Sequence, residues 1–82
     1  MEFKDELTEI LKRYFVDPKI DLEVTSAGKV GGVLVSHTFD NVDQLKRQDF
    51  LWSFLEKDLP KEKQRKIIAI LTMTPDEAGL PA

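Results

Sequence analysis

Cysteine is absent from this chain of 82 residues. Its absence excludes disulfides, thiolate metal sites, cysteine-ligated iron–sulfur clusters and cysteine nucleophiles together. Histidine occurs once, as His37, and without a cysteine or a second histidine to share a metal we expect no zinc site. No apolar run approaches the roughly 20 residues that cross a bilayer, and the N-terminus MEFKDELTEI is too charged for a signal peptide. We therefore expect a cytoplasmic protein with no membrane segment.

What is present predicts one small folded domain. Hydrophobic residues make up 41% and charged residues 33%, which suits a globular protein better than a disordered one. The net charge of −3 argues against a general nucleic-acid binder, which is usually basic. The charge is uneven, however, because residues 57–66, KDLPKEKQRK, carry 5 basic and 2 acidic side chains. This basic run is either a solvated loop or short helix, or a surface that contacts phosphate.

The first half of the chain predicts a helix followed by two strands. EFKDELTEILKRYFV has apolar residues at helical spacing, and Asp17-Pro18 ends the helix because the residue before proline avoids helical angles. KIDLEVTSA alternates apolar and polar residues, as a half-buried strand does. The glycines in GKVGG are interpreted as turn residues, and VLVSHTF as a second strand. Two strands joined by a glycine-rich loop predict an antiparallel hairpin.

The second half predicts helix, strand and a terminal turn. From Asp40 to Pro60 the apolar residues fit a helix of about four turns, with Asp40 or Asn41 as its N-cap, and KEKQRK adds a further turn. IIAILTM is continuously apolar, which predicts a strand covered on both faces and not a solvated edge. TPDEAG contains a capping box of Thr74 and Glu77 that starts a short helix ended by Gly79.

Together these elements predict an α+β fold of order α-β-β-α-(α)-β. The three strands form a small sheet with helices on one face. Phe50, Trp52, Phe54 and the aliphatic residues of the first helix would cover that face. We expect one domain over residues 1–82, a frayed tail at 80–82, and a monomer.

Little in the sequence predicts catalysis or a bound cofactor. His37 is a lone histidine at a strand end, where a surface or half-buried polar role is commoner than a ligand role. DNVD, from Asp40 to Asp43, lacks the glycine and later glutamate of a calcium loop. GKVG matches the GxxG string of the KH nucleic-acid fold, but it joins two strands here, so a hairpin turn is the better interpretation. We expect no enzyme and no cofactor.

The pair Lys46-Arg47 has two interpretations. Two cations near a helix start can contact phosphate. Asp43 and Asp49 flank them, so ion pairs along the helix are the alternative and the one we favour.

The order of elements and several motifs resemble the BolA-like family, whose fold is KH-like. Residues 34–39, LVSHTF, place Ser36 and Phe39 in register with the family pattern V-V-S-x-x-F, and Arg47 stands eight residues after Phe39, at the family's first arginine. Residues 72–77, TMTPDE, are similar to the family's T-x-T-P-E-E.

The departures concern the family's iron–sulfur chemistry. Asn41 stands at the family's glycine, which is tolerable because asparagine also adopts left-handed angles. Gln48 and Asp49 replace a histidine and an arginine. In BolA-like proteins a histidine before the last strand helps to bind a [2Fe–2S] cluster shared with monothiol glutaredoxins. Lys66 or Ile68 falls at that position, and neither replaces imidazole.

Two functions follow as hypotheses. The first is a non-enzymatic BolA-like interaction or regulatory protein that acts through protein partners, with a monothiol glutaredoxin implied by the resemblance, and without its own cluster ligand. The alternative is a nucleic-acid-binding domain, akin to a transcription regulator, that uses a basic helix face. The candidate contact residues for a partner or nucleic acid are Lys29, Lys46, Arg47, Lys61, Lys63, Arg65 and Lys66.

Overall fold

The computed structural model describes residues 2–79 and shows an α+β fold. Its elements are α1 (Phe3–Tyr14), β1 (Lys19–Val24), β2 (Val30–Val35), the 3-10 helix η1 (His37–Phe39), α2 (Gln44–Asp58), α3 (Lys61–Gln64) and β3 (Ile67–Met73). The predicted order of helices and strands is thus confirmed, with η1 as an addition.

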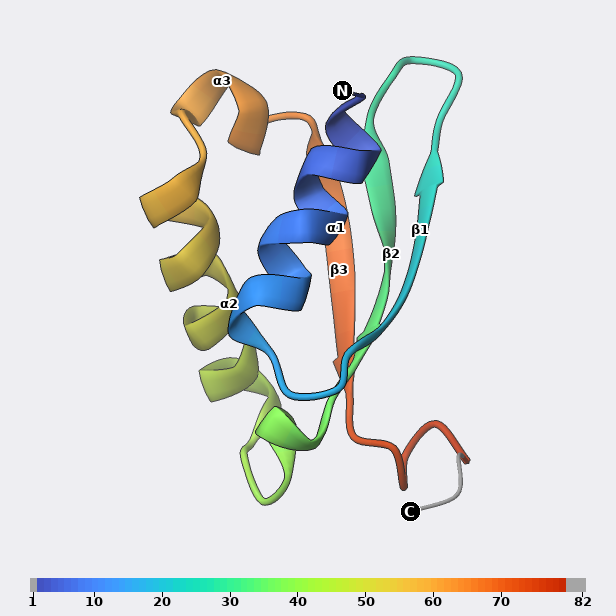
Figure 1. The fold of residues 1–82 in the computed structure, drawn as a ribbon, viewed down its shortest axis with the longest axis vertical. Helices are drawn as coiled ribbons and strands as arrows, with labels where there is room; N and C mark the ends of the chain where they lie inside the picture. Colours follow the sequence, from blue (N-terminus) through green and yellow to red (C-terminus); the bar gives the residue numbers. More distant parts are fainter. Residues whose placement is uncertain (1, 80–82) are drawn as a thin grey trace.

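The three strands form a mixed sheet of order β1-β2-β3 (Figure 1). β1 and β2 pair antiparallel, with Lys19 opposite Val35 and Val24 opposite Val30, so the predicted hairpin is confirmed. β3 returns after α2 and α3 and pairs parallel with β2. β2 is therefore the central strand, and β1 and β3 are the edges.

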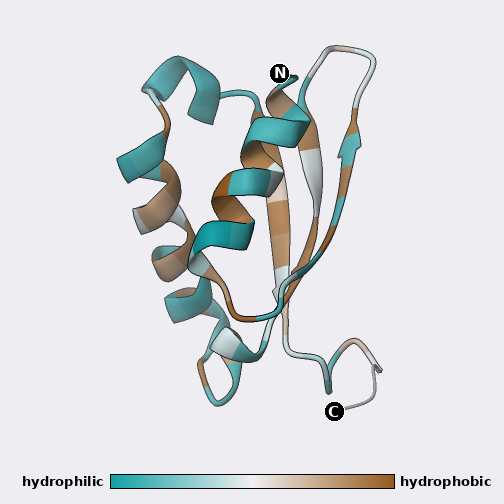
Figure 2. Cartoon of the chain, viewed as in Figure 1, coloured by the Kyte–Doolittle hydropathy of each residue, from teal (hydrophilic) through white to brown (hydrophobic). Residues whose placement is uncertain are grey.

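The helices pack on one face of this sheet and enclose the core. Leu7 and Leu11 of α1 and Leu51 and Leu55 of α2 have no exposed surface. Phe39 of η1 is also fully buried, so its aromatic ring fills the corner after β2. Figure 2 shows the amphipathic pattern directly: each long helix alternates hydrophilic and hydrophobic residues, while β3 is hydrophobic along most of its length.

β2 differs from its prediction because its glycines belong to the strand. Only Gly28 takes a turn conformation, with φ of 80°. Gly31 and Gly32 lie inside β2, and a Cβ atom at Gly32 would collide with the backbone carbonyl of Asp21 on β1. Glycine is needed here for close approach between strands, which is a different requirement from turn formation. The strand begins at Val30 and ends at Val35, so the prediction of strand for the HTF end of VLVSHTF is wrong: His37–Phe39 form η1, which Ser36 caps by accepting from the N–H of Thr38.

The predicted cap of α2 is wrong by two or three positions. Asp43 is the N-cap, and its Oδ1 accepts a hydrogen bond from the backbone N–H of Lys46 at 3.0 Å. Asn41 instead lies in the loop with φ of 61°, a left-handed angle that asparagine tolerates. Leu45, predicted on the apolar side of this helix, is 73% exposed.

The prediction that β3 is covered on both faces is also wrong. The strand occupies residues 67–73 as predicted, but it lies at the edge of the sheet. Ile68 is 58% and Leu71 is 62% exposed, because the helices cover only the side of Ile67 and Ile70. An apolar run indicates that a strand is suited to burial. It does not indicate whether the chain supplies helices for the second face of the sheet.

The last described segment is a turn and not a helix. Glu77 N–H donates to Thr74 Oγ1 at 3.1 Å, and Thr74 N–H donates to Glu77 Oε1 at 2.8 Å, so the predicted capping box forms. Gly79, with φ of 70°, closes the turn. The expected frayed tail at 80–82 lies outside the described residues.

Candidate functional site

The structure separates the basic residues singled out in the sequence into two groups at opposite ends of the molecule. Lys46 and Arg47 lie at the start of α2. The others lie on the β1–β2 hairpin and on α3 with the segment that follows it, at the other end (Figure 1). This second group, here called the basic end, consists of Lys29, Lys61, Lys63, Arg65 and Lys66.

The basic end is assembled by a contact between the hairpin and the entry to β3. The N–H of Val30 donates to the carbonyl of Lys66 at 2.7 Å, which brings the backbones of Lys29 and Lys66 side by side. Lys63 is engaged, since its Nζ donates to both carboxylate oxygens of Glu6 at 2.8 and 3.0 Å. The remaining members of the group have exposed side chains.

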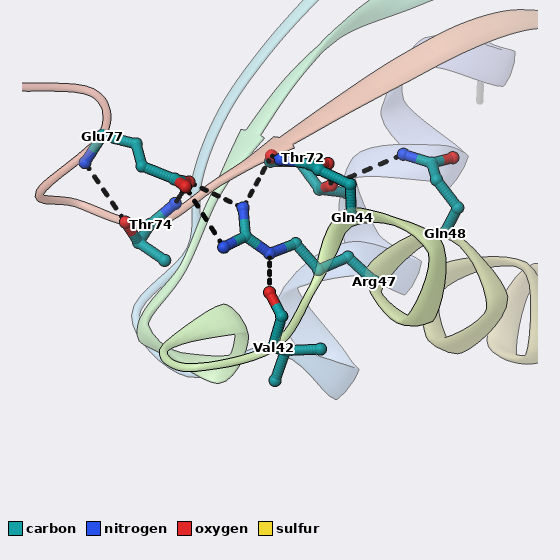
Figure 3. A network of polar contacts seen from close by, with 7 residues as sticks. All are labelled: Val42, Gln44, Arg47, Gln48, Thr72, Thr74 and Glu77. Carbon is teal, nitrogen blue, oxygen red and sulfur yellow. Dashed lines mark hydrogen bonds and ion pairs between the residues drawn. The ribbon is translucent and has the colours of Figure 1, made fainter.

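Arg47 is a structural residue at the other end (Figure 3). Its side chain is only 7% exposed. Nε donates to the carbonyl of Val42 at 2.6 Å, and Nη1 donates to the carbonyl of Thr72 at 3.3 Å. Nη1 and Nη2 also donate to the two carboxylate oxygens of Glu77 at 2.6 and 3.2 Å. The prediction that Arg47 pairs with Asp43 or Asp49 along the helix is therefore wrong, because its carboxylate partner is Glu77.

Glu77 combines two roles in this network. Its carboxylate completes the capping box with Thr74 and accepts hydrogen bonds from the guanidinium of Arg47 (Figure 3). The hydrogen bond from Arg47, followed by that from the Thr74 backbone, lowers the pKa of Glu77 from 4.5 to about 2. The carboxylate therefore stays charged at neutral pH and locks the turn after β3 to the start of α2.

Two glutamines of α2 close part of the outer edge of β3. Gln48 Nε2 donates to the carbonyl of Ile70 at 2.9 Å, and Gln44 Nε2 donates to the carbonyl of Thr72 at 3.3 Å. The Thr72 hydroxyl donates to Gln44 Oε1 at 3.1 Å. An unpaired strand edge is a template for another strand, so these side chains block strand addition at this point. Gln48 stands where the BolA-like pattern has histidine, and its role here is structural.

His37 contributes to a shallow cleft at the same end. Its Nδ1 lies 2.9 Å from Asp40 Oδ2, and both side chains are about half exposed. The cleft, of about 430 Å³, is lined by these residues, Asn41, Arg47 and the turn after β3. No three histidine, cysteine or carboxylate side chains within residues 2–79 are grouped to hold a metal ion.

An aromatic cluster on the helix layer is the feature that sequence reasoning missed. The ring of Phe50 packs edge-on against Phe15 at 6.0 Å and against Phe54 at 4.9 Å, and Tyr14 stacks on Phe54 at 4.2 Å. Phe50 nevertheless remains 42% exposed, and Val16, next to Phe15, is 57% exposed. We call Tyr14, Phe50 and Phe54 the aromatic patch. The spacing of Phe50 and Phe54 on one helix face was a signal for it, although the prediction placed both rings over the sheet.

None of the helices between residues 2 and 79 is long and apolar enough to span a bilayer. Comparisons with known protein families, with characterised proteins and with solved structures found no match. The resemblance to BolA-like proteins therefore stays a prediction from the sequence.

Proposed function

We propose that this chain is a non-enzymatic interaction domain that binds a protein partner through its helix layer. The observation that carries the proposal is Phe50, which is 42% exposed although neighbouring rings hold it in place. Aromatic side chains with little freedom to lose are the usual anchors of protein interfaces. A solvent-facing ring held in this way buries little surface within the fold, and a partner could bury the rest of it without restricting its motion further.

Charged side chains border the aromatic patch and indicate the chemistry of the partner. Lys46 stands one helical turn before Phe50 on α2, so the two share a face. Lys57 Nζ lies 5.9 Å from the centre of the Tyr14 ring, and Asp58, which accepts from the Tyr14 hydroxyl at 3.0 Å, is already paired with Arg13. A partner that offers an apolar pocket with acidic side chains at its rim would complement this surface. A monothiol glutaredoxin, implied by the BolA-like resemblance, is the first protein to test.

The test is a titration of the labelled chain with a monothiol glutaredoxin, followed by NMR. We expect shifts at the aromatic patch, and we expect Phe50→Ser to weaken binding by tenfold or more. Leu45→Ser is the matched control, because Leu45 is exposed on the same helix and lies away from Phe50. Equal losses in the two variants, or shifts confined to other surfaces, would contradict the proposal. Thermal unfolding of each variant shows whether the fold is intact.

The same mixture tests the expected absence of a cluster ligand. When the glutaredoxin carries its [2Fe–2S] cluster, we expect its visible absorption bands to remain unchanged on adding this chain. A shift in those bands that His37→Ala abolishes would instead identify His37 as a ligand.

Nucleic-acid binding is the second candidate function, and the geometry of the basic end favours it. The hydrogen bond between Val30 and Lys66 gathers Lys29 with the cations near α3. In a fluorescence assay with single-stranded oligonucleotides, affinity should fall steeply with salt, and Arg65→Ala should reduce the salt slope by about 1. Lys12→Ala on α1 is the control. Absence of binding in low salt at micromolar protein, or binding insensitive to salt, would exclude this candidate.

A further inference from the structure

The face of the sheet that points away from the helices has a regular arrangement of side chains. Strand pairing places Lys19, Val35 and Met73 in one row across the three strands. It places Asp21, Val33 and Leu71 in the middle row. Glu23 and Gly31 begin the third row, and Ile68 completes it, because a Cβ atom at Gly31 would lie 3.7 Å from the Cβ of Ile68. We call these nine residues the open face.

The open face is charged along β1 and apolar along β2 and β3. Its most exposed apolar members are Leu71, at 62%, and Ile68, at 58%. β2 and β3 pair parallel within this mixed sheet, and all-parallel sheets are normally covered on both faces. Within residues 2–79 no helix covers this face; only its first row is lined by the turn after β3, where Val35 is 8% exposed, and the rest is open to a second layer.

An occupant of the open face lies over it, and strand addition is blocked at the C-terminal half of β3. There the outward carbonyls of Ile70 and Thr72 already accept hydrogen bonds from Gln48 and Gln44. A further strand would have to displace these side chains before it could pair.

We propose that the occupant is a second copy of this chain, packed face to face about a two-fold axis that runs along the middle row, perpendicular to the strands. Such an axis reverses the strand direction and places the first row of one copy over the third row of the other. The middle row faces itself, so that Leu71 of one copy meets Leu71 of the other. An interface of this kind needs a surface that complements itself, and both the charges and the shape of the open face meet that condition.

The charges at the two ends of β1 are of opposite sign. The two-fold axis places Lys19 of one copy opposite Glu23 of its partner, and this pair occurs twice in the dimer. Packed sheets lie about 10 Å apart, a gap that a lysine and a glutamate side chain bridge together. Asp21, in the middle row, meets its own copy, which is the one repulsive contact of the arrangement.

The shape of the face is complementary in the same sense. A cleft of about 460 Å³ opens at the end of the first row, and its apolar lining includes Val33, Val35, Met73 and Ala78. The exposed side chain of Ile68 stands at the opposite end of the face. The two-fold axis exchanges the ends and places each Ile68 over the cleft of the other copy.

The size of the face sets the strength of the association. Three strands of about six residues cover roughly 14 by 20 Å. This area is smaller than the roughly 800 Å² that each partner buries in a stable complex. We therefore expect a weak, reversible dimer that forms at hundreds of micromolar protein, in place of the monomer expected from the sequence.

Sedimentation velocity from 10 µM to 2 mM tests the dimer. We expect the average mass to rise with concentration, and Leu71→Asp to remain a monomer throughout. Leu45→Asp, an exposed leucine on α2, is the control and should associate as the parent chain does. A monomer at all concentrations would overturn the proposal and leave the face to another occupant. A dimer insensitive to Leu71→Asp would overturn it by placing the contact elsewhere.

Charge exchange tests the orientation of the two copies. Lys19→Glu and Glu23→Lys should each weaken the dimer about tenfold, and the double variant should restore it. Asp21→Asn should strengthen the association, because it removes the repulsive contact. Failure of the double variant to recover would exclude this axis. The proposal does not depend on the aromatic patch: Phe50→Ser should leave the dimer unchanged, and Leu71→Asp should leave partner binding unchanged, so each hypothesis fails separately.

Discussion

Arg47 and Glu77, thirty positions apart in the chain, are joined by two parallel hydrogen bonds of 2.6 and 3.2 Å. The guanidinium is almost fully buried, while the carboxylate remains 44% exposed. The pair joins the first turn of α2 to the turn after β3, and further bonds from Arg47 to Val42 and Thr72 fix the loop and the strand on either side. One side chain thus joins the start of α2 and the loop before it to the end of β3 and the turn that follows, two regions distant in sequence.

Arg47→Met should destabilise the fold by about 2 kcal/mol, since it removes hydrogen bonds made by a charged group while it keeps much of the packing volume. Urea unfolding at pH 7 measures the change. Lys46→Met, one residue earlier and exposed, is the control and should have little effect. Similar losses in the two variants would show that the Arg47 network contributes nothing specific.

The stability contributed by Glu77 should depend on pH. Its pKa is lowered from 4.5 to about 2 in the folded chain, chiefly by Arg47. A depressed carboxyl pKa stabilises the folded state above pH 4.5, and this contribution is lost as the pH falls from 4.5 towards 2. Thermal unfolding of the parent chain and of Glu77→Gln should therefore differ at pH 7 and converge near pH 2. A difference that stays constant over this interval would contradict the assignment.

Gly32→Ala should destabilise the chain much more than Gly31→Ala. A Cβ atom at position 32 meets the Asp21 carbonyl of the neighbouring strand, whereas at position 31 the nearest atom, the Ala69 carbonyl oxygen, is 3.2 Å away. Overpacking of this kind costs about 1–3 kcal/mol. Denaturant unfolding of the two variants provides the comparison, and equal stabilities would show that the hairpin adjusts freely.

Removing the amides that cap β3 should increase self-assembly through the strand edge. In Gln44→Ala with Gln48→Ala, the carbonyl of Ile70 loses its side-chain donor and that of Thr72 keeps only Arg47, so this part of the edge becomes more available to another strand. We expect light scattering at raised temperature to increase faster than in the parent chain. Glu56→Ala and Lys57→Ala on the exposed end of α2 serve as controls. A double variant that scatters no faster would show that the edge is protected by other means.

The sequence was informative where periodicity determines structure. The alternation in KIDLEV and the apolar run of IIAILTM located β1 and β3, and the TPDE motif located the capping box. These patterns depend on residues that are close in the chain, so they can be recognised without knowing the fold.

What escaped prediction depends on contacts across the fold. Nothing near Arg47 indicates that its partner is Glu77, because Asp43 and Asp49 lie closer in sequence and have the same charge. The exposure of Leu71 depends on whether another layer covers β3, which no property of the strand itself determines. Likewise Gly32 was assigned to a turn, since the close approach of Asp21 is visible only after the strands are paired.

The position of β3 also sets the order in which the sheet can be assembled. β1 and β2 are neighbours in sequence and close a short loop, whereas β3 must return across the whole of α2 and α3 before it meets β2. Closing that longer loop costs more chain entropy, so we expect the contacts of β3 to form after the hairpin. On this order of events, Arg47 finds its partner Glu77 only after β3 has joined the sheet.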